Sequence, residues 1–170
     1  MIDKNTQAIL LLSCYFSKAK KDEPSPLTPS EYARYSRWLF ENKYMPGYLL
    51  DNFEETNNKW NDPKRKITSD RLKYLLGRGL AMSLALEKWS SAGIWIMARN
   101  DPDYPKQLKY HLKDKAPAIL FGVGNKKLLN SGGLAIVGSR NIDDSDKIFT
   151  KKIAKIIALY GKNIVSGGAR

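Results

Sequence analysis

The chain has 170 residues, enough for one domain or two small ones, and 42% of them are hydrophobic, enough for a packed core. Lysine and arginine number 29 against 17 aspartate and glutamate residues, which gives a formal charge of +12. Positive charges in such excess repel one another unless an anion compensates them, which favours nucleic acid as a partner. A lysine-rich soluble protein without such a partner is the alternative.

Several classes of protein are excluded or disfavoured. The single cysteine, Cys14, forms no internal disulfide, and its apolar helical surroundings favour a buried thiol over a nucleophile. The single histidine, His111, has no second histidine or cysteine cluster, so we expect no metal site. No apolar stretch is long enough to span a bilayer, so we expect no membrane contact. The first residues lack the build of a signal peptide, and we expect a cytoplasmic protein.

The first part of the chain is predicted to be helical. Residues 7–16 are apolar on most sides, which is typical of a helix inside a small bundle. Thr28-Pro29-Ser30-Glu31 predicts the start of a helix, with a capping hydroxyl, a proline in the first turn and an acid near the positive end of the dipole. Aromatic residues then recur at helical spacing, and core packing is favoured over stacking on bases. These residues are Tyr32, Tyr35 and Trp38, followed by Leu39.

A polar connection and two short helices follow. Residues 52–66 are polar and contain the basic run Lys64-Arg65-Lys66, which we interpret as a solvated surface segment. Ile67-Thr68-Ser69-Asp70 predicts another helix start, and Gly77-Arg78-Gly79 separates this helix from a second helical piece at 80–89. The arrangement suggests a helix-hairpin-helix binder of DNA backbone, whose turn amides would meet phosphate. A plain helix–helix corner is the alternative.

The rest of the chain has strand character, with four candidate strands at 94–98, 118–122, 134–138 and 163–166. Together they would form a partial sheet with one open edge. The apolar run 134–137 leads into Gly138-Ser139-Arg140, and the apolar run 163–165 leads into Ser166-Gly167-Gly168-Ala169-Arg170. A continuous apolar run is typical of a strand buried on both faces. A lysine-rich amphipathic helix lies between the two runs, so the segment predicts a βαβ crossover with parallel strands.

The two turns at the ends of these strands are the predicted site. Parallel strands end at the same edge of a sheet, where open α/β sheets bind ligands. Gly138 permits a tight turn, Ser139 offers a hydroxyl and an amide, and Arg140 adds a planar fork of donors that suits phosphate. Ser166, Gly167, Gly168 and Arg170 belong to the second turn.

The helix between the strands bears on the same site. Either Asp143-Asp144 or Ser145-Asp146 would cap it, and its first amides could add to an anion site unless those carboxylates occupy them. Apolar side chains at core spacing and lysines on another face complete the helix. The apolar residues are Phe149, Ile153, Ile156, Ile157 and Tyr160, and the lysines, expected to be solvated, are Lys147, Lys151 and Lys155.

Two familiar phosphate motifs are absent from the sequence. Arg140 occupies the position of the second glycine in G-x-G-x-x-G, and no G-x-x-x-x-G-K-[ST] loop occurs. The site is therefore predicted for phosphate, but not for NAD or for ATP hydrolysis by those routes, and we expect no cofactor. No catalytic acid or base stands near it, so we expect no enzyme activity.

The two strand–turn segments, 134–140 and 164–170, closely resemble the DNA-processing protein A family, DprA or Smf. Further matches are Gly93-Ile94, the Asp103-Tyr104-Pro105 turn with Leu108, and the run from Pro117 to Phe121 that leads to Gly124-Asn125. The resemblance is specific from about Ile67 onward. It implies an α/β protein in which a small helical domain precedes an extended Rossmann-like parallel sheet.

For this chain the resemblance implies a helical domain at 1–90, of the SAM or helix-hairpin-helix type, and the amino-terminal part of the Rossmann-like DNA-binding domain at 91–170. It also implies sequence-independent binding of single-stranded DNA, protection of incoming DNA, and delivery to the recombinase RecA in natural transformation. Ser139 and Arg140 would contact DNA phosphates, with Gly138, Ser166, Gly167, Gly168 and Arg170 lining the same pocket. Full-length members form homodimers.

The chain differs from the family in its length, because members continue past the second turn with further strands and helices. We therefore expect an amino-terminal piece of a longer protein, with weaker DNA binding and without the dimer surface. A nucleotide- or nucleoside-phosphate-binding enzyme or sensor of the wider Rossmann-like group is the alternative function. A fragment that retains its fold without function is a third possibility.

Overall fold

The structure is a computed structural model that describes residues 2–18, 21–139 and 141–167. The chain divides into two compact units, Met1–Gly124 and Asn125–Arg170. The elements of the first unit are α1 (Lys4–Ser13), α2 (Pro29–Glu41), η1 (Pro46–Leu50), α3 (Phe53–Asn57), α4 (Ser69–Leu76), α5 (Gly79–Ser91), β1 (Trp95–Ala98), α6 (Lys106–Leu112), η2 (Lys113–Lys115) and β2 (Ile119–Gly122). Those of the second unit are η3 (Lys126–Asn130), β3 (Leu134–Ile136), α7 (Asp144–Leu159) and β4 (Ile164–Ser166).

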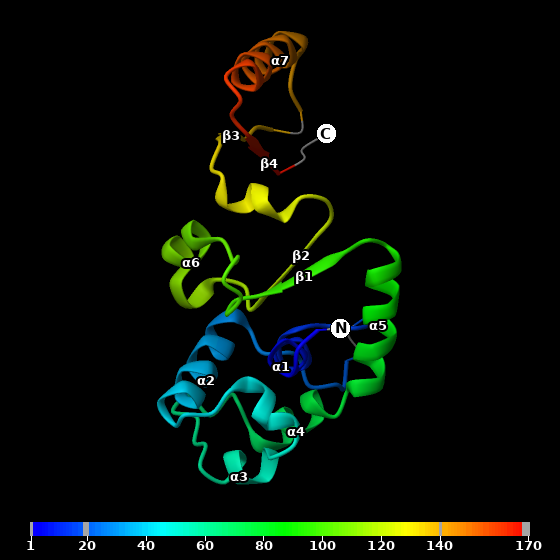
Figure 1. The fold of residues 1–170 in the computed structure, drawn as a ribbon, viewed down its shortest axis with the longest axis vertical. Helices are drawn as coiled ribbons and strands as arrows, with labels where there is room; N and C mark the ends of the chain where they lie inside the picture. The colour runs from blue at the N-terminus through cyan, green and yellow to red at the C-terminus, as the bar shows by residue number, and fades with distance from the viewer. Residues whose placement is uncertain (1, 19–20, 140, 168–170) are drawn as a thin grey trace. The chain divides into compact units, whose positions relative to one another are not determined.

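Helix α1 is the centre of the first unit. Its residues 8–12 are all buried, because α2, η1, α4, α5 and the β1–β2 pair surround it (Figure 1). Asp3 begins the helix by accepting hydrogen bonds from the backbone N–H groups of Asn5 and Thr6. The prediction of a helix packed inside a small bundle is confirmed, although the helix ends at Ser13 and Tyr15 beyond it is exposed.

Helix α2 begins as its sequence predicts. The Thr28 hydroxyl accepts the Glu31 N–H, and the Glu31 carboxylate accepts the Thr28 N–H, with Pro29 in the first turn. This reciprocal cap satisfies two backbone donors that a helix start otherwise leaves without partners.

The aromatic residues of α2 belong to the core. Tyr32, Tyr35 and Leu39 are buried, and Trp38 packs against the same cluster. The rings of Tyr35 and Trp60 meet edge to face, with 4.9 Å between their centroids. Core packing therefore explains the aromatic spacing.

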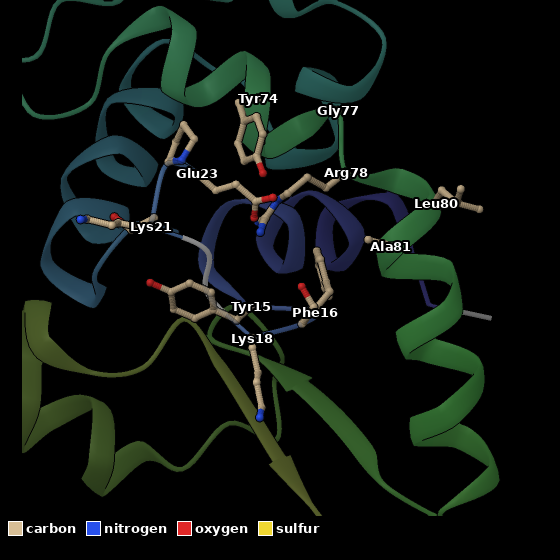
Figure 2. Close-up of a pocket in the computed structure, with 13 residues that line it drawn as sticks. Tyr15, Phe16, Lys18, Lys21, Glu23, Tyr74, Gly77, Arg78, Leu80 and Ala81 are labelled. Carbon is tan, nitrogen blue, oxygen red and sulfur yellow. The ribbon is translucent and has the colours of Figure 1, made fainter.

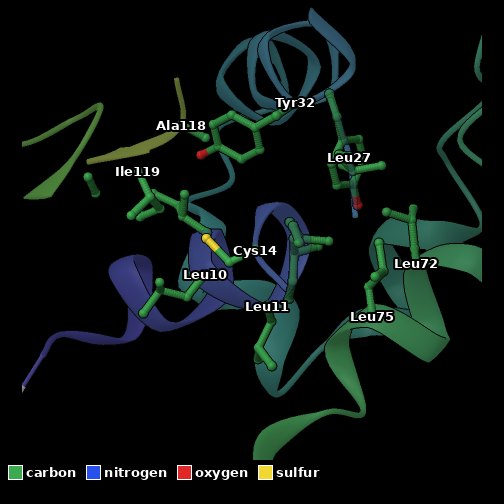
Figure 3. Close-up of a cluster of buried hydrophobic side chains, with 14 of the residues drawn as sticks. Leu10, Leu11, Cys14, Leu27, Tyr32, Leu72, Leu75, Ala118 and Ile119 are labelled. Atoms are coloured by element: carbon green, nitrogen blue, oxygen red, sulfur yellow. The ribbon is translucent and has the colours of Figure 1, made fainter. Parts of the chain in front are cut away.

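Figure 3 shows how the core joins segments that are distant in the sequence. Side chains of α1, α2, α4 and β2 meet around Leu11 and Cys14. Burial raises the pKa of the Cys14 thiol to about 12, so the thiol is protonated at neutral pH and unreactive. The interpretation of Cys14 as a core residue is confirmed.

Strands β1 and β2 pair antiparallel, with Trp95 opposite Gly122 and Ala98 opposite Ile119. They form a sheet of their own, and β3 with β4 forms another, whereas the sequence predicts one partial sheet of four strands. The connection between β1 and β2 runs through α6, which has no buried residue, so no crossover helix covers this sheet. The buried ends of both strands pack on the helical core instead.

This packing places the β1–β2 pair in the first unit, whose last residue is Gly124. The sequence places the domain boundary between residues 90 and 91, where helical character gives way to strand character. That boundary stays a prediction.

The second unit is the predicted βαβ crossover. Strands β3 and β4 pair in parallel, and α7 connects them and contacts β4. The mixed α/β class and the parallel pairing are thus confirmed. The longest helix is α7 with 16 residues, and none of the helices in the described ranges has the length and apolarity that a membrane span requires.

The prediction that these strands are buried on both faces is wrong. No residue of the described part of the second unit is buried; Ile136 is half-buried and Val165 is 57% exposed. One helix on a two-stranded sheet provides a single covering layer, whereas burial of both faces requires two.

Candidate nucleic-acid interface

The two predicted turns lie at the same edge of the β3–β4 sheet. The parallel register places Ile136 opposite Ser166, so Gly138 and Ser139 leave β3 beside the point where Gly167 leaves β4. The structure therefore brings together the predicted residues that it describes. The other three, Arg140, Gly168 and Arg170, lie outside the described residues.

Asn163 connects the starts of β3 and β4, at the end of the sheet away from the two turns. Its carbonyl oxygen accepts the Leu134 N–H at 2.9 Å, and its side-chain amide donates to the Ser131 hydroxyl and the Gly132 carbonyl. A Cβ atom on Gly133 would lie 2.6 Å from the Asn163 carbonyl oxygen, so glycine is required there. This contact fixes the register that aligns the two turns.

Ser139 is exposed at the end of β3. Its hydroxyl oxygen accepts the backbone N–H of Asn141 at 3.1 Å, which closes a short turn after the strand. A hydroxyl that accepts one hydrogen bond keeps its own O–H as a donor. Ser139 is therefore oriented by the turn and retains a donor suited to a phosphate oxygen.

The site glycines have open surroundings. Among the described residues, a Cβ atom added to Gly138 or to Gly167 would meet no atom within 4 Å beyond the adjacent residues, and neither glycine has a positive φ. The predicted reason for Gly138, a tight turn without a side-chain clash, is therefore wrong. Glycine at these positions leaves the backbone open to close approach by a ligand.

Asp143 caps α7. Its carboxylate accepts the Asp146 N–H and the Ser145 hydroxyl, each at 2.8 Å. The hydrogen bond from the Asp146 amide, followed by the one from Ser145, lowers the pKa of Asp143. The expectation that a carboxylate occupies amides at this helix start is confirmed, so an anion there would compete with Asp143.

Only some of the α7 side chains that the sequence places at core spacing are buried even in part. Ile153 and Ile157 are half-buried, whereas Phe149 is 66% exposed and Tyr160 is exposed too. The lysines predicted to be solvated, Lys147, Lys151 and Lys155, are all exposed. The cause is the same as for the strands: one sheet face covers one side of the helix.

Sequence reasoning missed Asn163 and Asn141, which shape the site without belonging to the predicted set. The contact with Asn141 has a local signal, because a serine hydroxyl often accepts the backbone N–H of the residue two positions later and so closes a turn. Asn163 has no local signal, since its partners Ser131 and Gly132 precede it by about 30 residues.

A cavity of about 580 Å³ lies in the first unit beside the α4–α5 corner. In Figure 2 the side chains of Glu23, Tyr74 and Arg78 point toward one another, whereas Lys18 and Lys21 point away from them. The Arg78 guanidinium donates to the carbonyl oxygens of Leu11 and Leu75 and covers the Phe16 ring. Burial lowers its pKa, but a guanidinium stays charged.

Arg78 therefore connects the α4–α5 corner to the end of α1 through hydrogen bonds. The Gly77 and Arg78 amides donate to carbonyls of α4. Two amides of the turn and its arginine are thus engaged by the protein itself. The plain helix–helix corner and the backbone-binding hairpin both stay predictions.

Among the described residues, no group of three or more histidine, cysteine, aspartate or glutamate side chains is arranged to hold a metal ion. In the described residues, the β3–β4 edge offers the exposed Ser139 hydroxyl and open space beside Gly138 and Gly167. Such an edge suits an extended, flexible ligand better than a small enclosed one.

The second unit is a parallel βαβ unit in which Gly138, Ser139 and Gly167 follow the two strands at one sheet edge, which defines a mixed α/β fold. Residues 95–170 match the family of DNA recombination-mediator protein A. The resemblance to the DprA family is thus confirmed over this segment. Comparisons with curated proteins and with solved structures gave no match.

Proposed function

We propose that this protein binds single-stranded DNA through its phosphates at the β3–β4 edge, without preference for sequence. The match of residues 95–170 to the family of DNA recombination-mediator protein A supports a role in DNA processing during recombination. The observation that supports this proposal most directly is the parallel register of β3 and β4, which places the exposed Ser139 beside Gly167.

The chemistry of the edge supports phosphate contacts. The Ser139 hydroxyl retains a donor, and the open space at Gly138 and Gly167 lets a phosphate approach the backbone. Asp143 at the start of α7 restricts the anion to the turns themselves, because its carboxylate already accepts an amide there. Contacts of this kind carry no base information.

The proposal includes no catalytic step. Phosphate contacts position a strand without breaking a bond, and delivery of that strand to RecA is the proposed purpose of binding. Because phosphate contacts release counterions, affinity should fall steeply with salt.

Fluorescence anisotropy with a labelled mixed-sequence oligonucleotide, at two salt concentrations, tests the proposal. We expect steep salt dependence and equal binding of unrelated sequences. Salt-insensitive binding or strong preference for one sequence would contradict it, and competition by a mononucleotide at similar concentration would indicate a small-molecule site instead.

Ser139→Ala should weaken binding by about 1.5–3 kcal/mol, the range for a hydrogen bond to a charged group. Ser145→Ala is the matched control, because it removes an exposed hydroxyl of the same unit whose partner is Asp143. Equal affinities of the two variants would exclude Ser139 from the interface.

A further inference from the structure

A basic loop connects α3 to α4 and is folded around one carboxylate. We define the basic loop as residues 62–67. The Asp62 carboxylate accepts the backbone N–H groups of Lys64 at 3.2 Å, Lys66 at 2.7 Å and Ile67 at 2.9 Å. Arg34 of α2 donates to the same carboxylate from Nε at 2.8 Å and from Nη2 at 3.1 Å. Five hydrogen bonds to one buried side chain hold this loop in place.

The backbone of the basic loop is further constrained. Arg65 adopts a left-handed conformation with φ of 51°, which is unfavourable for a residue other than glycine. Its N–H donates to the Asp62 carbonyl at 2.9 Å, and Arg71 of α4 donates to the Lys66 carbonyl at 2.9 Å. The surrounding contacts therefore enforce a conformation that the loop would not adopt by itself.

The basic loop presents three successive cations to solvent. Lys64, Arg65 and Lys66 are exposed, and within the described ranges none of their charged groups forms a hydrogen bond or ion pair. Asp62, which holds the loop, forms an ion pair with Arg34, and Glu31 forms one with Arg71, which also donates to the loop. Three adjacent like charges repel one another, and an external anion relieves this repulsion.

We propose that Lys64, Arg65 and Lys66 form a second contact for the phosphate backbone of single-stranded DNA, on the first unit. The inference rests on the proposed function but uses residues outside the β3–β4 edge. A strand carries phosphates at regular intervals, which matches a run of cations, and lysine and arginine are common phosphate ligands. Because folding has already ordered the loop backbone, binding orders only the side chains.

The test compares two triple variants of the full chain. The first carries Lys64→Gln, Arg65→Gln and Lys66→Gln. The control carries Lys88→Gln, Lys109→Gln and Lys115→Gln, which removes three exposed charges from scattered positions of the same unit. Both variants lose the same net charge, so a difference between them reports the location of the charges.

We expect the plot of log affinity for mixed-sequence single-stranded DNA against log salt to be shallower by about 2 in the loop variant, since each phosphate contact on a single strand contributes about 0.7. The control should change the slope much less. Equal slopes for the two variants, with the wild-type protein binding DNA, overturn this inference alone. Absence of binding by the wild-type protein overturns the proposed function as well.

Asp62→Asn tests whether the order of the loop matters. The variant gains positive charge, so general electrostatic attraction predicts equal or tighter binding. The proposal predicts weaker binding, because the backbone that presents the cations loses its anchor. Equal or tighter binding by a folded Asp62→Asn protein, verified by circular dichroism, contradicts the proposal; if this variant does not fold, the triple variants decide the question.

Discussion

Arg34 and Asp62 form a bidentate ion pair between α2 and the basic loop, with 2.8 Å between Nε and Oδ1 and 3.1 Å between Nη2 and Oδ2. The Asp62 side chain is 2% exposed. Burial by itself raises the pKa of this carboxyl, but the hydrogen bonds from Arg34 and three backbone amides outweigh it and hold the pKa well below its usual range.

The pair makes stability dependent on pH in the acid range. Because the pKa of Asp62 is lower in the folded state than its ordinary value of 3.8, its contribution is complete above that value and is lost as the pH falls through the folded pKa. Asp62→Asn should cost about 3–5 kcal/mol at neutral pH, the range for removing one partner of a buried ion pair. Urea unfolding at several pH values should show this difference shrinking below about pH 4. A difference that stays constant down to acid pH would contradict the assignment.

Tyr35 is fully buried, and its hydroxyl has no hydrogen-bond partner among the described residues. A buried unsatisfied hydroxyl costs about 1–3 kcal/mol. Tyr35→Phe should therefore leave the free energy of unfolding unchanged or raise it. Tyr104→Phe is the control, because the Tyr104 hydroxyl donates to the Pro117 carbonyl oxygen at 2.8 Å and the loss of this hydrogen bond should cost about 0.5–1.5 kcal/mol. If Tyr35→Phe destabilises the protein more than Tyr104→Phe in thermal melts, the Tyr35 hydroxyl has a partner after all.

Two glycines of the second unit should respond differently to alanine. At Gly133 a Cβ atom would lie 2.6 Å from a backbone oxygen, so Gly133→Ala should destabilise by about 1–3 kcal/mol. At Gly138 an added Cβ atom would meet no atom of the described residues within 4 Å beyond its chain neighbours, so Gly138→Ala should change stability by less than about 0.5 kcal/mol and weaken DNA binding by obstructing the approach of phosphate. Denaturation and anisotropy on both variants provide the check, and a destabilised Gly138→Ala protein would assign that glycine to the fold instead.

Arg140 lies outside the described residues, and its role stays a prediction from the sequence. Arg140→Ala should weaken single-stranded DNA binding by about 1–3 kcal/mol, and Arg140→Lys should recover part of that loss, because lysine keeps the charge without the fork. The structural alternative is an ion pair with Asp143, Asp144 or Asp146.

Measuring the melting temperature together with the affinity separates the two roles of Arg140. A structural arginine would lower the melting temperature on replacement and leave the affinity of the folded fraction unchanged. Unchanged DNA binding by a folded Arg140→Ala protein would remove this residue from the site.

The sequence by itself determined the features that depend on neighbouring residues. The cap at Thr28 and Glu31 and the all-apolar helix α1 follow from side chains within a few positions of one another. The crossover from β3 through α7 to β4 follows from the pattern of apolar runs, and with it the alignment of Ser139 and Gly167 at one edge.

Tertiary structure decided the features that depend on partners distant in the chain. Asp62 binds Arg34, which is 28 positions away in the sequence, and Arg78 binds the Leu11 carbonyl, which is 67 positions away. The neighbouring sequence therefore does not show that Asp62 orders the basic loop or that Arg78 holds the α4–α5 corner. Apolar patterning predicts which side chains can be buried, but burial also requires a covering layer. That is why the strand 134–136 is apolar in sequence, yet Leu134 and Ala135 are exposed and Ile136 is only half-buried.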